Sequence, residues 1–243
     1  LDPSTPIVMI DKKPAFKTKE DMGRWWGKEN EKFEYGITNH YGLYIPGSLY
    51  FFARLGTVVN RRSGAEVNKI IRDVDYLIHK VMYDDRKSSR WSLYLKSRNC
   101  GFTTQAGGVI PIYFAYMYAG CTVNLTSADN ERIGKMFRKC LMPMYEGMDI
   151  EVRPDKKSKN DSDVGVGLTL MVNTIENGKH KTKDTYIRCK ATAHSESAAS
   201  SFSGGGSMYN NIDEKYLNTR GEKVAQSLID VSRDKDSGLL EGY

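Results

Sequence analysis

Basic and aromatic side chains are the residues of this 243-residue chain whose types and spacing most readily suggest chemistry. The sequence holds 36 lysines and arginines against 30 aspartates and glutamates, a formal net charge of +6. Some cations lie close in sequence to Tyr83, Trp91 and Tyr94. The cations of interest are Arg61, Arg62, Arg86, Lys87, Arg90, Lys96, Arg98, Lys156, Lys157 and Lys159. This combination suits the phosphates and bases of nucleic acid, although charge runs also occur as ordinary solvated faces.

Catalytic and metal-binding patterns are weak by comparison. The four histidines are scattered, and the four cysteines are widely spaced without a C-x-x-C pair. Acidic pairs have no base or nucleophile beside them in sequence; these pairs are Asp73/Asp75, Asp84/Asp85 and Asp161/Asp163. We therefore expect reduced cysteines, no metal site, no cofactor and no hydrolase activity.

Two glycine clusters deserve comparison with phosphate-binding loops. Gly165-Val166-Gly167 and Gly204-Gly205-Gly206 both lack the spacing of a Walker or dinucleotide-binding motif. We expect the first cluster to permit a tight entry into a strand and the second to be a linker.

Hydrophobic patterning predicts an α+β protein in which helices lie on sheets. Helices are expected over Glu20–Lys32, Glu66–Met82, Ile133–Leu141 with N-cap candidates at Ser127 and Asp129, and Glu214–Val231. Strands are expected over Phe33–Asn39, Ser48–Asn60, Trp91–Lys96, Val109–Met117, Cys121–Leu125 and Met148–Arg153. A hairpin is expected from Gly167–Asn173 to Tyr186–Ala193 across a turn at Asn177-Gly178.

Composition divides the chain into four parts. Residues 1–32 read as an extended basic arm, 33–194 as an α+β core, 195–212 as a flexible Ser/Gly linker, and 213–243 as a C-terminal helix and tail. The start at Leu1 lacks a methionine, so a processed or truncated N-terminus is expected. No apolar run approaches the roughly 18 residues of a membrane span, so no membrane partner is expected.

Several short motifs occur in a telling order. Gly36-Ile37-Thr38-Asn39 precedes a helix, then Leu93–Gly101, then Gln105–Val109; later come Ser162–Leu170 and Gly221–Ile229. This order resembles the family of RNA 3'-terminal phosphate cyclases and cyclase-like proteins, with its G-[IV]-T-N turn and its strand carrying R-G-x-x-P-x-G-G-G-x-V. The resemblance covers roughly residues 33–238 and implies the cyclase fold, with helices packed on mixed and antiparallel sheets.

The departures from the family pattern bear on activity. Asn99 and Cys100 interrupt the Arg-Gly pair, and no histidine follows His194, whereas an active cyclase needs a histidine nucleophile beyond the last family helix. The resemblance therefore implies the non-catalytic cyclase-like branch of small-ribosomal-subunit biogenesis. We expect an RNA-associated assembly factor of rRNA processing in a nucleolar or nuclear ribonucleoprotein, with pre-ribosomal RNA and proteins, including a GTPase, as partners.

A viral capsid or nucleocapsid subunit is the alternative hypothesis. The non-methionine start, strands near Ser48 and Tyr186, and the Ser/Gly tail suit a subunit cut from a polyprotein and located in the virion. Its basic loops would then face the genome. The expected helices at Glu66 and Glu214 disfavour a jelly roll of about eight strands.

Two candidate anion sites follow. Arg98 beside a glycine turn at Gly107 and Gly108 would place a guanidinium and backbone N–H groups around a phosphate. The second is residues 155–163, with Lys156, Lys157 and Lys159 and no apolar side chain. Because this segment has no apolar side chain to bury, burial cannot offset the conformational entropy lost when its backbone is ordered. We therefore expect a mobile loop that becomes ordered on binding RNA or an acidic partner.

Overall fold

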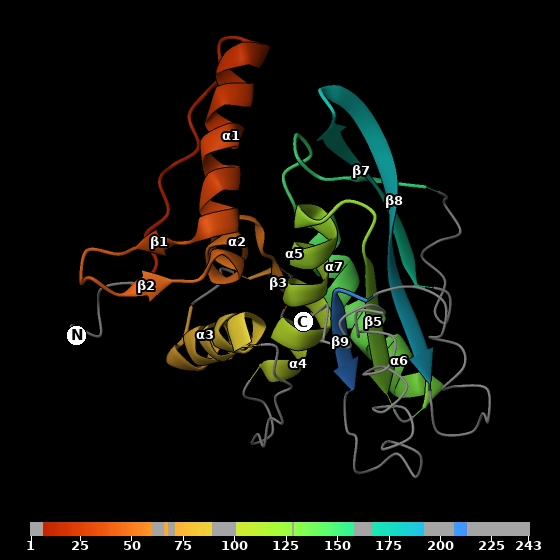
Figure 1. Cartoon of the computed structure of the whole chain (residues 1–243). Coiled ribbons are helices and arrows are strands. Elements are labelled where there is room, and N and C mark those ends of the chain that lie inside the picture. The colour runs from red at the N-terminus through yellow and green to blue at the C-terminus, as the bar shows by residue number, and fades with distance from the viewer. Residues whose placement is uncertain are drawn as a thin grey trace.

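The computed structural model describes residues 7–59, 66–67, 71–88, 101–127, 129–157, 167–191 and 207–212. These residues form helices and a mixed five-stranded sheet, which confirms the α+β class. Figure 1 shows three layers: helices α1–α3 on one side, the helix that contains α5 in the middle, and the sheet on the other side. The central layer therefore joins the N-terminal helices to the sheet.

The N-terminal layer begins with α1 (Lys19–Tyr35), capped by Thr18, whose hydroxyl accepts a 3.0 Å hydrogen bond from the Asp21 amide. The expected helix over Glu20–Lys32 is confirmed, and it extends into the expected strand Phe33–Asn39, of which only β1 (Ile37–Thr38) remains. β1 pairs with β2 (Tyr44–Ile45) ahead of α2 (Gly47–Leu55).

The N-terminal segment docks on its own chain. Val8 is buried in the core, and Lys13 forms ion pairs of 3.2 Å with Asp149 and 2.8 Å with Glu151. The indole Nε1 of Trp26 donates to the same Glu151 at 2.9 Å. Residues 7–32 thus combine a short extended segment with most of α1.

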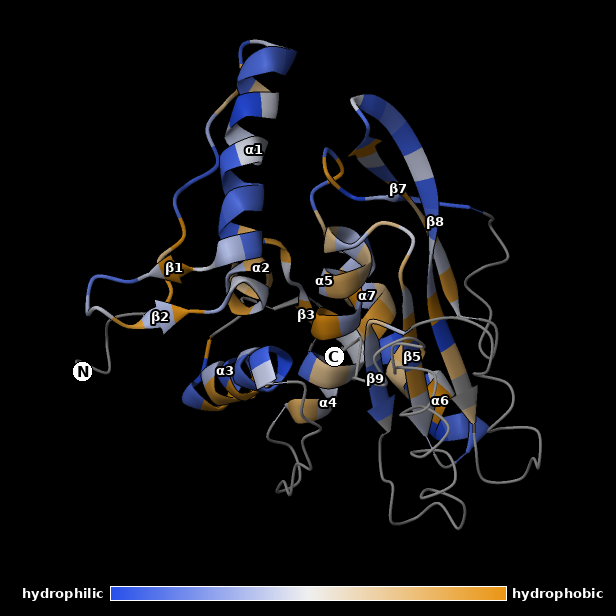
Figure 2. Cartoon of the chain, viewed as in Figure 1, coloured by the Kyte–Doolittle hydropathy of each residue, from blue (hydrophilic) through white to orange (hydrophobic). Residues whose placement is uncertain are grey.

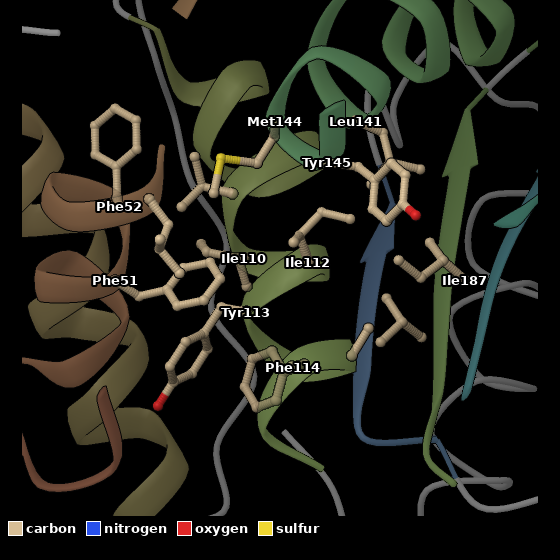
Figure 3. Close-up of a cluster of buried hydrophobic side chains, with 14 of the residues drawn as sticks. Phe51, Phe52, Ile110, Ile112, Tyr113, Phe114, Leu141, Met144, Tyr145 and Ile187 are labelled. Atoms are coloured by element: carbon tan, nitrogen blue, oxygen red, sulfur yellow. The ribbon is translucent and has the colours of Figure 1, made fainter. Parts of the chain in front are cut away.

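The central layer is a helical segment whose residues 105–115 are all buried. It consists of α4 (Phe102–Thr104), the π-helical η1 (Gln105–Val109) and α5 (Ile110–Met117). Figure 3 shows Phe51 and Phe52 on one side of this segment and Ile187 on the other. A helix that is apolar on all sides belongs in a protein interior, so the strand expected over Val109–Met117 was wrong.

A second long helical segment covers the sheet beside α5. It runs through α6 (Asn130–Met136), the π-helical η2 (Phe137–Leu141) and α7 (Met142–Glu146). The carboxylate of Asp129 accepts a 2.8 Å hydrogen bond from the Arg132 amide. The expected helix over Ile133–Leu141 is confirmed. Of its two N-cap candidates, Asp129 is the cap, whereas Ser127 ends β5.

The sheet has the strand order β6-β7-β8-β5-β9. Its strands are β5 (Thr122–Ser127), β6 (Asp155–Lys156), β7 (Leu168–Glu176), β8 (Lys179–Ala191) and β9 (Tyr209–Ile212). β6, β7 and β8 are antiparallel neighbours, whereas β5 runs parallel to both β8 and β9. The expected strand over Cys121–Leu125 is confirmed as β5.

The β7–β8 hairpin is confirmed, together with its turn. Asn177 and Gly178 have φ angles of 51° and 72°, the two positive values that a type I′ turn requires. Gly167 leads into β7 at φ 100°, where a Cβ would lie 2.0 Å from the Ile187 carbonyl oxygen. Glycine is therefore needed at this tight strand entry, as expected.

Several other expected elements were wrong. The aromatic run after Ser48 forms α2, followed by β3 (Val58–Val59), instead of a long strand. The helix expected over Glu66–Met82 starts only at Asp73, because Glu66–Val67 forms β4, which pairs with β3. The observed helix, α3, spans Asp73–Ser88.

Two corrections concern the second half of the chain. Residues 148–153, expected as a strand, form turns in which the Asp149 carbonyl accepts hydrogen bonds from the amides of Val152 and Arg153. β9 lies in the expected 195–212 linker.

Some expectations lie outside the described residues, namely the strand Trp91–Lys96, the helix Glu214–Val231 and the glycine run at 204–206. Among the helices that the structure describes, none combines the length and the apolar character needed to cross a bilayer.

The packing of the two long helical segments gives a stability prediction. A Cβ on Gly108 would lie 2.7 Å from the backbone oxygen of Cys140, whereas one on Gly107 would meet the side chain of Met136. A backbone group cannot move aside as a methionine side chain can. We expect Gly108→Ala to lower the free energy of unfolding by about 2 kcal/mol.

Gly107→Ala is the matched control. The helix propensity gained from alanine, about 1 kcal/mol, offsets the Met136 rearrangement, so this variant should stay within about 1 kcal/mol of the parent. Urea unfolding of both variants measures the two free energies of unfolding. If both variants lose the same stability, collision with the Cys140 backbone does not explain the effect of Gly108→Ala.

Candidate nucleic-acid interface

A buried polar network is the feature that most resembles catalytic machinery. Nδ1 of His79 lies 2.7 Å from Oγ of Ser48, and Nε2 lies 3.0 Å from Oε1 of Gln105. Nε2 of Gln105 donates to Asp75 at 2.9 Å, and Asp75 receives two further bonds from the Arg72 guanidinium. Because the Gln105 amide nitrogen is used by Asp75, we assign the imidazole proton to Nε2 and the Ser48 proton to the bond with Nδ1.

The location of this network argues against nucleophilic catalysis. Ser48, His79, Gln105 and Asp75 are all buried, and His79 is completely enclosed. Burial lowers the pKa of His79 to about 4, although the Gln105 hydrogen bond and the Asp75 charge act in the opposite direction. The network therefore holds a neutral imidazole that ties together α2, α3 and η1.

An open basic surface lies on the helix-facing side of the sheet. Alternation along the strands and the pairing of Lys156 with Leu170 and of Val172 with Lys183 put Lys156, Lys179, Lys181 and Lys183 on one face. We call these four lysines, together with Arg153, the basic inner face. Figure 1 shows that the hairpin extends past the end of α5, and Figure 2 shows that its far part is hydrophilic.

One carboxylate organises the hairpin half of the basic inner face. Glu176 pairs with Lys181 at 3.0 Å and also with Lys183, and hydrogen bonds from these two lysines lower its pKa. The side chains of Lys181 and Lys183 stay 52% and 40% exposed. Their ammonium groups are therefore held in place while still open to a ligand.

Tyr145 organises the other half. The Arg153 guanidinium lies 5.5 Å and the Lys156 ammonium 5.3 Å from the centre of its ring, both within cation–π distance. Arg153 also donates a 2.8 Å hydrogen bond to the Glu146 carbonyl. These five cations outnumber the carboxylates near them, which are Glu176, Glu146 and Asp155, so the surface is of the kind that attracts a polyanion.

Lys157 points to the opposite face of the sheet, which we call the outer face. Its ammonium pairs with Asp184 of β8, and its amide donates to the Thr169 carbonyl at 3.1 Å. Tyr186, two residues further along β8, places its hydroxyl 3.4 Å from Asp184 and its ring 5.8 Å from the Arg188 guanidinium. The two neighbours Lys156 and Lys157 therefore serve different surfaces.

The sequence-based sites are only partly found in this arrangement. Gly107 and Gly108 are buried in η1, so the expected glycine turn was wrong. At Gly108 a side chain would collide with the backbone of Cys140, so helix packing accounts for this glycine. Arg98 and Lys159 lie outside the described residues. Asp155 and Lys156 form β6, so the expected mobile loop begins with an ordered strand; its residues 158–163 also lie outside the described part.

The sequence reasoning missed Lys179, Lys181 and Lys183. Their signal was present in Lys179-His180-Lys181-Thr182-Lys183, directly after the Asn-Gly turn. A period of two in a strand places all three lysines on one face.

Metal ligands give no further candidate: the described part of the chain contains no cluster of three or more His, Cys, Asp or Glu residues able to hold an ion. The sequence matches no known protein-family model, and comparison with curated proteins finds no significant match.

The buried His79 predicts a pH dependence of stability. In the unfolded chain its imidazole takes up a proton near pH 6.5, whereas in the folded chain it does so only near pH 4. The unfolded state binds more protons between these values, so the stabilising effect is complete above pH 6.5 and is lost as the pH falls toward 4. We expect a loss of about 3 kcal/mol from this residue.

Urea unfolding of the parent and of His79→Gln across pH 7 to 4 measures this contribution. The variant should be less stable at pH 7 but should lose less stability on acidification. Parallel pH profiles for the two proteins would contradict the assignment.

Proposed function

We propose that this chain is a non-catalytic RNA-binding protein of a ribonucleoprotein assembly, and that its basic inner face holds the RNA backbone. The observation that carries the proposal is the placement of Lys179, Lys181 and Lys183 on one face of a projecting hairpin, beside Lys156 and Arg153. RNA phosphates are the polyanion that such a surface recognises, since each contact releases condensed counterions.

The arrangement favours backbone binding over base reading. Lysine ammonium groups act as point charges and attract phosphates without a preferred orientation. Arg153 lies against Tyr145, so its guanidinium is pre-oriented rather than free to search. We therefore propose sequence-tolerant binding with a strong dependence on salt.

A binding role without turnover fits the rest of the described chain. Ser48 and His79 are the nucleophile and base that lie closest together, and both are enclosed in the core, away from the basic inner face. A substrate on that face would meet lysines and Glu176 but no activated nucleophile or bound base.

The nature of the assembly is a further part of the proposal. The motif order supports a nucleolar role in pre-ribosomal RNA processing with protein partners such as a GTPase, but the helical Gln105–Val109 and the turns over 148–153 differ from the strands that the cyclase resemblance implies. The basic inner face does not depend on that resemblance. Sequencing the RNA that co-purifies with the native protein distinguishes the two hypotheses. Pre-ribosomal RNA supports the assembly factor, whereas a viral genome bound by many copies of this chain supports the capsid subunit.

RNA binding by the basic inner face is tested with the double variant Lys179→Ser and Lys181→Ser. Two phosphate contacts are lost, so the slope of log affinity against log salt should become shallower by about 1.4 for single-stranded RNA. Fluorescence anisotropy with a labelled oligonucleotide at several salt concentrations measures both affinity and slope.

The double variant Lys19→Ser and Lys28→Ser is the matched control, since it removes the same charge from exposed positions of α1. Its slope should stay close to that of the parent. If both double variants change the slope equally, the binding depends on net charge and not on the basic inner face. If the parent itself binds no RNA, the proposed function is wrong.

A further inference from the structure

We infer that the outer face of the sheet carries a stacking site for one unpaired nucleobase, centred on Tyr186. The inference rests on the proposed function and deepens it, because it specifies the RNA as single-stranded. Tyr186 lies on β8 and its residue is 37% exposed. Among the tyrosines, phenylalanines and tryptophans of the described strands, it is the one on the outer face of this sheet.

The neighbours of Tyr186 leave room for a planar ligand. Across the sheet it pairs with Thr169 of β7 and with Thr122 of β5, so small side chains flank the ring on both adjacent strands. Along β8, the side chains on the same face are Asp184 and Arg188. Thr122 is buried, and Met171 of β7 lies on the same face opposite Asp184, so we infer that a flat base reaches the ring over Thr169.

Polar contacts also hold the ring in place before a ligand arrives. The Tyr186 hydroxyl lies 3.4 Å from Oδ2 of Asp184, the same carboxylate oxygen that pairs with Lys157. Arg188 lies on the other side, 5.8 Å from the ring centre. A nucleotide stacked on Tyr186 would thus find a cation on either side for its phosphates.

The chemistry of the outer face selects nucleic acid as the occupant. Stacking requires one exposed ring and nearby cations, and it tolerates any base because each base has a π-face. A protein partner would instead need a broad apolar core, whereas the neighbours of Tyr186 on this face are Thr169, Thr122, Asp184 and Arg188, with Met171 as one apolar residue among them. The bases of a duplex are hidden within their stack, so only an unpaired strand can use the site.

The short edge strand β6 connects the two faces. Lys156 belongs to the basic inner face, and the next residue, Lys157, points to the outer face. Lys157 lies opposite Thr169, which in turn lies opposite Tyr186, so two strand spacings of roughly 5 Å separate it from the ring. One RNA strand passing over this edge would contact lysines on the inner face and the ring on the outer face.

The test compares Tyr186→Ala with Tyr186→Phe and Tyr186→Leu, using a labelled single-stranded RNA oligonucleotide and its duplex. Tyr186→Ala and Tyr186→Leu should weaken single-strand binding about tenfold at every salt concentration, with an unchanged salt slope, because stacking releases no counterions. Tyr186→Phe keeps the ring and should bind within about twofold of the parent. Duplex binding should not respond to any of these changes.

Tyr41→Ala is the control, since Tyr41 is a tyrosine of similar exposure, 40%, in the connection between β1 and β2. Figure 1 shows these two strands away from the five-stranded sheet. Thermal unfolding of each variant checks folding, and Tyr186→Leu preserves side-chain bulk if the alanine variant does not fold. The inference is overturned if Tyr186→Leu binds the single strand like Tyr41→Ala, or if single strand and duplex lose affinity equally. If the Lys179/Lys181 double variant weakens RNA binding but the Tyr186 variants do not, the proposed function holds and the stacking site is wrong.

Discussion

Burial of one helical segment, residues 105–115, is the constraint on which the rest of the structure depends. This segment has the helices α1–α3 on one side and the inner face of the sheet on the other (Figure 1), and every one of its residues is buried. Hydrogen bonds reinforce this packing at both layers: the Tyr113 hydroxyl donates to the Phe33 carbonyl at 3.0 Å, and the Tyr209 hydroxyl donates to the Ala106 carbonyl at 3.1 Å. Removing the segment would expose apolar surface on both neighbouring layers at once.

Polar residues at the borders of this core fix how the layers meet. Gln105, at the start of η1, completes the bonds of His79 and Asp75 on α3, and His79 in turn reaches Ser48 on α2. These groups are satisfied only in one arrangement of the three helices, since an unpaired buried polar atom costs about 1–3 kcal/mol. The network therefore specifies the packing, which explains a serine–histidine pair that no substrate can reach.

The same core explains why the β7–β8 hairpin is available for binding. Leu168, Leu170 and Ile187 pack against the central layer, whereas residues 173–182 continue beyond it and are largely exposed. The buried half anchors the strands, and regular alternation sorts the side chains of the hairpin onto two faces. Lys179 and Lys181 lie on the inner face of the exposed half, whereas Tyr186 lies on the outer face of the anchored half, next to Ile187.

The sequence predicted best those elements whose signals are local. The Asn177-Gly178 turn, the entry at Gly167 and the cap at Asp129 each depend on a few neighbouring residues, and all three are confirmed. The runs after Ser48 and Val109 were wrongly predicted as strands, because a short apolar run rich in aromatic and β-branched residues fits a buried helix equally well. Only tertiary packing decides between the two.

The candidate site was harder to predict than the fold. Lys156 was found from charge alone, but its separation from Lys157 onto opposite faces depends on the pairing of β6 with β7, which joins segments separated in sequence. Gly107 and Gly108 suggested a phosphate turn, whereas close contact with the Cys140 backbone accounts for Gly108. A glycine required for packing and one required for a ligand look the same in a single sequence.

RNA binding by the two faces of the sheet can be mapped by ultraviolet crosslinking of the purified full chain to single-stranded RNA, followed by mass spectrometry of the crosslinked peptides. We expect crosslinks to concentrate in β6 and in the β7–β8 hairpin, with Tyr186 among the modified residues. Crosslinks confined to α1, α3 or α6, or no crosslinks above those of a non-binding protein, would contradict this expectation.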